Sequence, residues 1–194
     1  MQQTPSPARK ATRIADADPY LHLVTLGGER LPHVSGTLAA HLRRTENLLR
    51  SWGGRHALCM AGLYHAVYGT AGIRHNLLDV SERRSVAAVI GAEAEAIAYL
   101  YGACDRARYH PRIGTAMQWC FADRFTGAEY PLSATSLRDF CELTVANEVE
   151  LATTSERFRQ RYRSELCVFF DRMHGLISDA ATTAYRRALG HDAQ

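Results

Sequence analysis

The segment that most constrains the fold is residues 58–70, which read LCMAGLYHAVYGT. Its apolar residues recur at steps of three and four, the period of a helix that packs on a core. His65 lies on or beside this apolar stripe, so its imidazole is expected to point into the protein. The sequence therefore predicts a buried helix, with one histidine near its end, around which the domain is built.

Helical patterns fill most of the remaining sequence. We expect helices near residues 37–52, 55–67, 81–91, 92–101, 135–151, 155–174 and 178–189, and a short helix at 115–124. Residues 19–31 are expected to form a short strand or an irregular segment, and residues 125–133 a hairpin or an extended loop. The pattern predicts an all-α single domain at residues 19–190, after a disordered leader at residues 1–18.

Several helix ends carry recognisable signals. Ser35 or Thr37 is expected to cap the helix that carries His41, and Gly53 to end it. Ser81 and Ser155 are expected to cap two later helices. The helix after Ser155 has an apolar stripe that we assign to the core: Phe158, Tyr162, Leu166, Phe169, Phe170 and Met173.

Composition excludes some classes of function. The net charge of +3 on 194 residues is too small to argue for a nucleic-acid or membrane partner, even with the basic run at residues 157–163. No apolar run is long enough to span a membrane, and the N-terminus lacks the apolar segment of a secretory signal. Five cysteines without CxxC spacing favour a reducing, cytoplasmic location. The oligomeric state stays open.

The best chemical lead is a pair of histidines, His41 and His65, on consecutive predicted helices. By themselves, such residues are most simply core histidines that hydrogen-bond across two helices. The motifs around them add a second interpretation.

The order of these motifs resembles the HD-domain superfamily, most closely the branch that hydrolyses the alarmone (p)ppGpp. His41 precedes His65 by 24 residues, a spacing similar to that branch. HAVYGT at residues 65–70 aligns with the family motif HDxxEDT, and residues 90–102 resemble its FGxEVAxLV segment. ANEVEL at residues 146–151 stands where the family has an ADRLHN-like motif.

The resemblance implies an HD-like helical bundle with a divalent metal on His41 and His65. The chain departs from the family at the carboxylates, because Ala66 and Asn147 replace its two aspartate ligands. Tyr68 and Gly69 replace the family's Glu-Asp pair. In this the chain resembles uncharacterised HD-like proteins with an altered HD motif.

A metal on two imidazoles needs a third or fourth ligand. Imidazole suits iron or zinc, whereas manganese prefers more oxygen ligands. Asp105, in a turn after a helix, is the first candidate for the missing ligand. Further candidates are His33, His75, Asn147, Glu148 and Glu150.

A small anionic molecule is the expected substrate. Arg44 and Arg74 flank the histidine helices, and their guanidinium groups are suited to a phosphate or carboxylate. Tyr68 and Asn147 are expected to be polar groups of the same pocket. The other arginines near the predicted mouth are expected to be solvated: Arg43, Arg83, Arg84, Arg106 and Arg108.

These residues lead to three hypotheses. The first is a divergent HD-family enzyme that uses Fe, Mn or Zn to hydrolyse, or oxidise with iron, a small anionic molecule. The second is a catalytically degenerate HD-like module that binds a small molecule or another protein. The third is an unrelated helical bundle, which would follow if His41 and His65 pointed to opposite sides.

Overall fold

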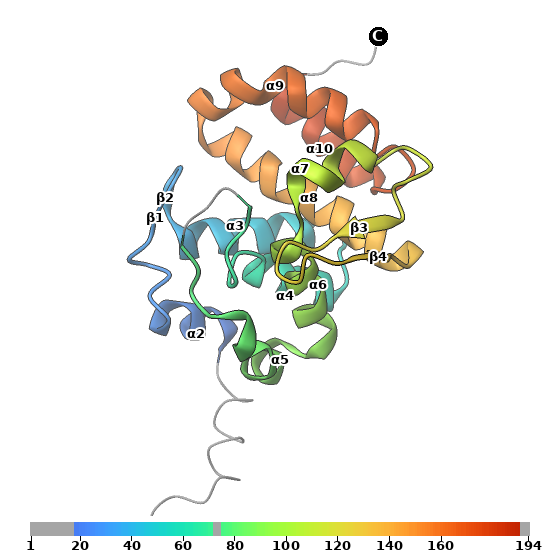
Figure 1. The fold of residues 1–194 in the computed structure, drawn as a ribbon. Coiled ribbons are helices and arrows are strands. Elements are labelled where there is room, and N and C mark those ends of the chain that lie inside the picture. The colour runs from blue at the N-terminus through green and yellow to red at the C-terminus, as the bar shows by residue number, and fades with distance from the viewer. Residues whose placement is uncertain (1–17, 72–74, 191–194) are drawn as a thin grey trace, which may run out of the picture.

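The computed structural model describes residues 18–71 and 75–190 and is mostly helical (Figure 1), which confirms the all-α class. Its α-helices are α2 (Pro19–Thr25), α3 (Leu38–Ser51), α4 (His56–Tyr64), α5 (Arg83–Ile90), α6 (Ala92–Ala103), α7 (Arg106–Tyr109), α8 (Ala134–Thr154), α9 (Glu156–Asp171) and α10 (Asp179–Leu189). Short 3-10 turns precede α5 at Val80–Glu82 and follow α7 at His110–Arg112. Two antiparallel hairpins pair β1 (Pro32–His33) with β2 (Gly36–Thr37), and β3 (Cys120–Ala122) with β4 (Glu129–Pro131).

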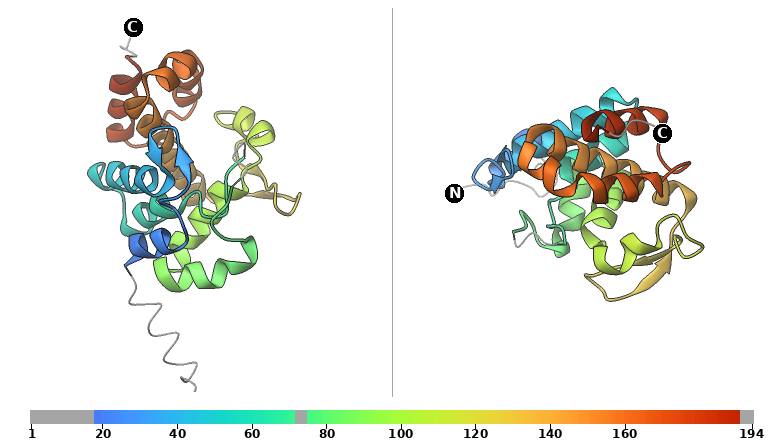
Figure 2. Two further views of the ribbon diagram at one scale, coloured as in Figure 1. Left: turned by 90° about the vertical axis from the view of Figure 1, so that its left-hand side faces the viewer. Right: turned by 90° about the horizontal axis from the view of Figure 1, so that it is seen from above.

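Helix α8 is the central element of the fold. It packs against α3, α4, α6, α9 and α10. In Figure 1, α9 and α10 lie above α8, whereas α5 and α6 lie below it. Figure 2 shows the β3–β4 hairpin projecting from one side of this helical body. Because neighbours cover α8 on several sides, its buried residues are not confined to one stripe, and polar groups such as Asn147 and Glu150 are buried too.

Helices α3 and α4 cross at close range. Gly62 permits this contact, because a Cβ atom there would lie 2.5 Å from Cδ1 of Leu49. Every residue from Leu58 to Tyr64 is buried, which confirms the prediction of a core helix. The helix ends at Tyr64, so His65 is its C-cap residue and lies just past the regular helix.

The helix-end signals are confirmed in three of four positions. The Thr37 side chain accepts a hydrogen bond from the amide of Ala40, and that of Ser155 from Phe158. Gly53 has a φ of +78°, as expected of a glycine that ends a helix. The prediction for Ser81 is wrong, since Asp79 caps the 3-10 turn there and accepts from the amide of Ser81.

Two other predictions are corrected. Residues 19–25 form helix α2 because Asp18 accepts from two amides of its first turn and Pro19 stands at the first helical position, where no N–H is needed. Residues 115–124 contain no helix. The Thr115 hydroxyl accepts from the amide of Met117 in a turn, and Cys120–Ala122 then pairs with Glu129–Pro131. This pairing gives the hairpin that was one of two expectations for residues 125–133.

Other expectations fall partly outside the described ranges. The leader predicted at residues 1–18 lies outside them except for Asp18, and Arg74 lies outside them as well. Within the described part of the chain, no helix is long and apolar enough to cross a lipid bilayer. The five cysteines are free thiols, four of them buried.

Candidate functional site

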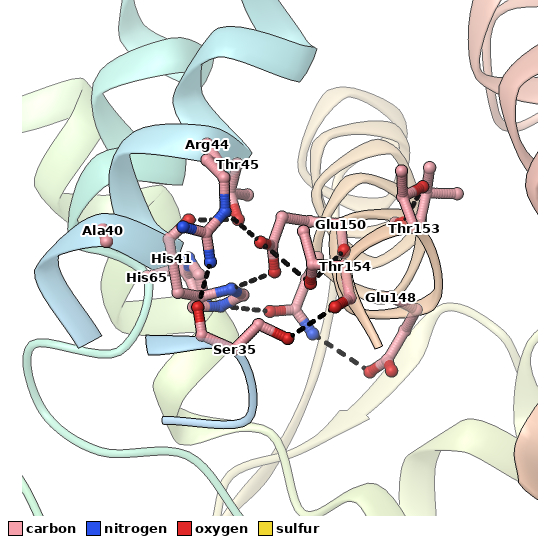
Figure 3. A network of polar contacts seen from close by, with 12 residues as sticks. Ser35, Ala40, His41, Arg44, Thr45, His65, Glu148, Glu150, Thr153 and Thr154 are labelled. Carbon is pink, nitrogen blue, oxygen red and sulfur yellow. Dashed lines mark hydrogen bonds and ion pairs between the residues drawn. The ribbon is translucent and has the colours of Figure 1, made fainter. Parts of the chain in front are cut away.

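A buried carboxylate from α8 holds the first histidine. Nδ1 of His41 lies 2.5 Å from Oε2 of Glu150, and Nε of Arg44 donates to the other oxygen at 2.5 Å (Figure 3). His41 and Glu150 are only 1% and 2% exposed. Burial raises the pKa of the Glu150 carboxyl, but its bonds to His41 and Arg44 outweigh burial and hold the pKa below its usual value. Glu150 is therefore ionised and orients the His41 ring.

A backbone carbonyl holds the second histidine. Nδ1 of His65 lies 2.8 Å from the carbonyl oxygen of Gly62, one turn earlier. A carbonyl can only accept, so Nδ1 carries the hydrogen. Burial, aided by the nearby His41, lowers the pKa of His65 well below its usual value. His65 is therefore neutral at physiological pH, and its Nε2 presents a lone pair.

Three polar atoms converge between the helices. Nε2 of His41 lies 3.3 Å from Nε2 of His65 and 3.0 Å from Oδ1 of Asn147. The Asn147 amide donates through Nδ2 to Glu148 at 3.1 Å, which leaves its oxygen facing His41. With Nδ1–H of His41 directed at Glu150, a neutral His41 would add another lone pair. A metal ion between these atoms would satisfy all three of them, and a hydrogen on Nε2 of His41 would satisfy one contact.

The geometry of the two rings fits a divalent metal. Two nitrogen ligands of a tetrahedral zinc ion, each ~2.0–2.1 Å from the metal, are about 3.3–3.4 Å apart. The far nitrogens of both rings are hydrogen-bonded to a carboxylate and a backbone carbonyl, the partners that usually orient metal-binding histidines. The described residues contain no group of three or more His, Cys, Asp or Glu side chains that could hold a metal. The donor set here would be His41, His65 and the amide oxygen of Asn147, which suits zinc or iron better than manganese.

These three residues lie at one end of a cavity of about 1150 Å³. Ala66 also lines it, in the position where the HD motif has its aspartate. Other polar side chains of this cavity come from β1 and from the region of α7 and α8: His33, Arg106, His110 and Glu148.

Arg106 is the residue of the cavity best suited to bind an anion, because its guanidinium donors are only partly used. Its Nη2 donates to the Tyr101 hydroxyl at 3.2 Å, and its ion pair with Glu148 is long, at 3.8 Å. Burial raises the pKa of the Glu148 carboxyl above its usual value. From its sequence we expect Arg106 to be solvated, but its side chain lines the cavity. The direction of its side chain depends on the short helix α7, which the sequence did not indicate.

The ring of His33 stacks on that of His41. The two rings stack with centroids 4.1 Å apart and an interplanar angle of 20°. Burial, together with repulsion from His41, lowers the pKa of His33 to about 4. Nδ1 of His33 is buried and has no hydrogen-bond partner within the described residues. His33 thus lines the cavity with a neutral ring, whose Nδ1 is buried without a partner.

The other predicted site residues lie elsewhere. Asp105 caps α7 by accepting from the amide of Arg108 at 3.2 Å, and it does not line the cavity. The Tyr68 hydroxyl donates to Glu95 at 3.0 Å, also away from the cavity. Arg44 lies behind His41, where it holds Glu150.

His75, a further candidate ligand, is exposed, and Arg74 lies outside the described residues. Of the residues predicted for the site, the structure brings together His41, His65 and Asn147. The contact between His41 and Glu150 joins residues 109 positions apart, and the sequence named Glu150 only among several possible ligands.

The chain is similar to one known family in its first half. A family model described as a domain of unknown function (DUF6817) matches residues 22–106. No curated protein and no solved structure matches the chain. The matched region contains His41, His65 and Arg106 but not α8, which supplies Asn147, Glu148 and Glu150.

Proposed function

We propose that this protein is a metal-dependent enzyme of an altered HD type that acts on a small anionic molecule in the cavity. The observation that carries the proposal is the pair of Nε2 atoms, 3.3 Å apart, on two rings whose Nδ1 atoms are already hydrogen-bonded. The reaction proposed is hydrolysis of a phosphate-bearing molecule or, if the metal is iron, oxidation of the substrate with molecular oxygen as the electron acceptor.

Two features support an HD-like arrangement. The histidines lie on or directly after consecutive helices and face each other, and Asn147 joins them from a later helix. This is the order in which the family supplies its ligands. The substitution of Ala66 and Asn147 for aspartates leaves a donor set without charge, so a divalent ion on it would keep its full charge toward the cavity and favour an anionic substrate.

The residues of this chain have separate roles in the proposed reaction. His41, His65 and Asn147 would hold the metal, which when bound lowers the pKa of a coordinated water and polarises a substrate oxygen. Arg106 binds and orients the anionic group through N–H donors that its long ion pair leaves available. Glu148, whose raised pKa brings it nearer to neutral pH, holds or accepts a proton beside them.

A second candidate function is metal-free binding of the same class of molecule. It is favoured by the 3.0 Å contact between Nε2 of His41 and Oδ1 of Asn147, which is a good hydrogen bond when His41 is protonated. Glu150 would stabilise that imidazolium. In this case the fold keeps the pocket without the metal chemistry.

Metal content decides between the two. The protein is purified without a metal-affinity column and subjected to elemental analysis, beside a His41→Ala/His65→Ala double variant and a His75→Ala control at an exposed position. Near-stoichiometric zinc, iron or manganese in the wild type and the control, lost in the double variant, is the expected result. If the wild type holds no metal and a Co²⁺ titration gives no ligand-field absorption, the metal-dependent enzyme is excluded and metal-free binding is favoured.

A further inference from the structure

The cavity is far larger than a metal ion and one phosphate group require. Its volume of about 1150 Å³ exceeds the ~300–1,000 Å³ typical of pockets for small molecules. The histidine pair and Asn147 occupy one end of it. The cavity therefore has room for a ligand with a larger body attached to the anionic group.

One wall of this space is an apolar stripe of α9. Phe158, Tyr162, Leu166 and Phe169 are spaced four, four and three residues apart, which places them on one helix face, and all four line the cavity. The helical period alone predicts that this stripe belongs to the core. Leu166 and Phe169 are buried, whereas Phe158 and Tyr162 are only half-buried, with their rings 4.7 Å apart. Phe158 and Tyr162, near the start of α9, thus present apolar surface to the cavity.

Two exposed valines continue this apolar surface outward. Val34, in the turn of the β1–β2 hairpin, is 54% exposed, and Val168, on α9, is 64% exposed. Both line the cavity.

Two of the four charged groups that line the cavity, Arg106 and Glu148, act electrostatically on the histidine pair. The long 3.8 Å pair between them leaves the guanidinium able to accept a second anionic partner. Arg172 and Glu165 also line the cavity, but both are exposed on or after α9. The lining therefore combines a cation near the histidines, Arg106, with apolar surface from the first half of α9 at Phe158 and Tyr162.

We propose that the cavity takes an amphiphilic anion, with a carboxylate or phosphate head at Arg106 and an aliphatic or aryl body against Phe158 and Tyr162. This inference deepens the proposed function, on which it rests for the identification of the cavity as the substrate site. It does not depend on whether a metal is bound.

Calorimetric titration with a chain-length series tests it. The probes are butyrate, hexanoate, octanoate and octyl phosphate, with octanol and inorganic phosphate as comparisons. Affinity is expected to rise about fourfold for each added CH₂ group. Octanol, which lacks the anionic head, and inorganic phosphate, which lacks the body, should each bind at least tenfold more weakly than octyl phosphate.

Two variants test which residue contacts the anionic head of the ligand and which contacts its apolar body. Arg106→Gln should weaken octanoate at least tenfold and leave the dependence on chain length unchanged, whereas Phe158→Ser should reduce that dependence. Arg187→Gln, the same charge change at an exposed position of α10, is the matched control. Circular dichroism of each variant shows whether it is folded.

The series is run on chelator-treated protein and again with added Zn²⁺. A chain-length dependence without any bound metal supports the inference even if the metal-dependent enzyme is excluded. Affinities that do not change with chain length, or octanol binding as tightly as octanoate, overturn the inference even if elemental analysis finds a stoichiometric metal.

Discussion

Nε2 of His41 and Nε2 of His65 face each other across 3.3 Å, and each ring is hydrogen-bonded on its far side. One ring is held by a carboxylate of α8 and the other by the backbone carbonyl of Gly62. This arrangement fixes both ring orientations before any ligand arrives. The two Nε2 atoms are consequently held close together where they line the cavity.

Asn147→Asp should increase metal affinity at least tenfold, and more for Mn²⁺ than for Zn²⁺. The substitution replaces a neutral amide oxygen by a carboxylate, the ligand that hard ions prefer. Competition titrations with both metals measure the change. Asn147→Leu, which keeps the size but removes the oxygen donor, should lower the affinity for both. Equal affinities in all three proteins would show that Asn147 does not contact the metal.

Glu150→Gln should lower the free energy of unfolding by about 2–3 kcal/mol, because the buried His41 and the partly exposed Arg44 lose their charged partner. Urea denaturation measures the change. The control is Glu156→Gln, which removes an exposed ion pair with Arg159 and should cost much less. Similar losses in both variants would argue against a special role for Glu150.

Gly62→Ala should destabilise the protein by about 1–3 kcal/mol. The added methyl group would lie 2.5 Å from Cδ1 of Leu49, so α3 and α4 would have to separate or Leu49 would have to change rotamer. Denaturation of the double variant Gly62→Ala/Leu49→Ala tests the cause. Its loss should be smaller than the sum of the two single losses. Strictly additive losses would mean that the two side chains do not clash.

The free energy of unfolding should fall as the pH drops from about 6.5 toward 4. Burial, together with the charges of Arg106 and Arg172, lowers the pKa of His110 to about 3, and burial, together with repulsion from His41, lowers that of His33 to about 4. In the unfolded chain these histidines titrate near 6.5, so the unfolded state binds more protons below that pH. The stabilisation is complete above 6.5 and is lost as the pH approaches the folded values.

His110→Phe isolates one of these contributions. The phenyl ring can keep the stacking on Phe169, whose ring centroid lies 4.6 Å from that of His110. Between pH 4 and 6 the slope of unfolding free energy against pH should decrease by about 1 kcal/mol per pH unit. An unchanged slope would mean that His110 titrates alike in the folded and unfolded chains.

Much of the helical framework could be predicted because its signals are local. The apolar period of α4, the glycine after α3 and the serine before α9 each act within a few residues. Helix α2 was missed because seven residues are too few to show a period. The short helix expected near Thr115 was wrong because a side-chain turn and strand pairing compete with it there.

The site was predictable only in part. His41, His65 and Asn147 could be named from motif order, but whether Asp105 reached them depended on the direction of a turn. That turn uses the carboxylate to cap α7. The sequence could not show which apolar residues of α9 pack in the core and which line the cavity. A helical period indicates only that one face of the helix is shielded from water. Which part of it meets packed neighbours and which part meets open space depends on how α9 lies on α8.

Residues 41, 65, 147 and 150 come from three well-separated parts of the chain and meet only in the folded protein. The unfolded chain has no such site, so any molecule that occupies it must also shift the folding equilibrium by mass action. An occupant present at a free concentration of about 100 times its dissociation constant would add roughly 2.7 kcal/mol to the free energy of unfolding. A rise in melting temperature across a panel of metals and amphiphilic anions would therefore report the natural occupant before any reaction is known.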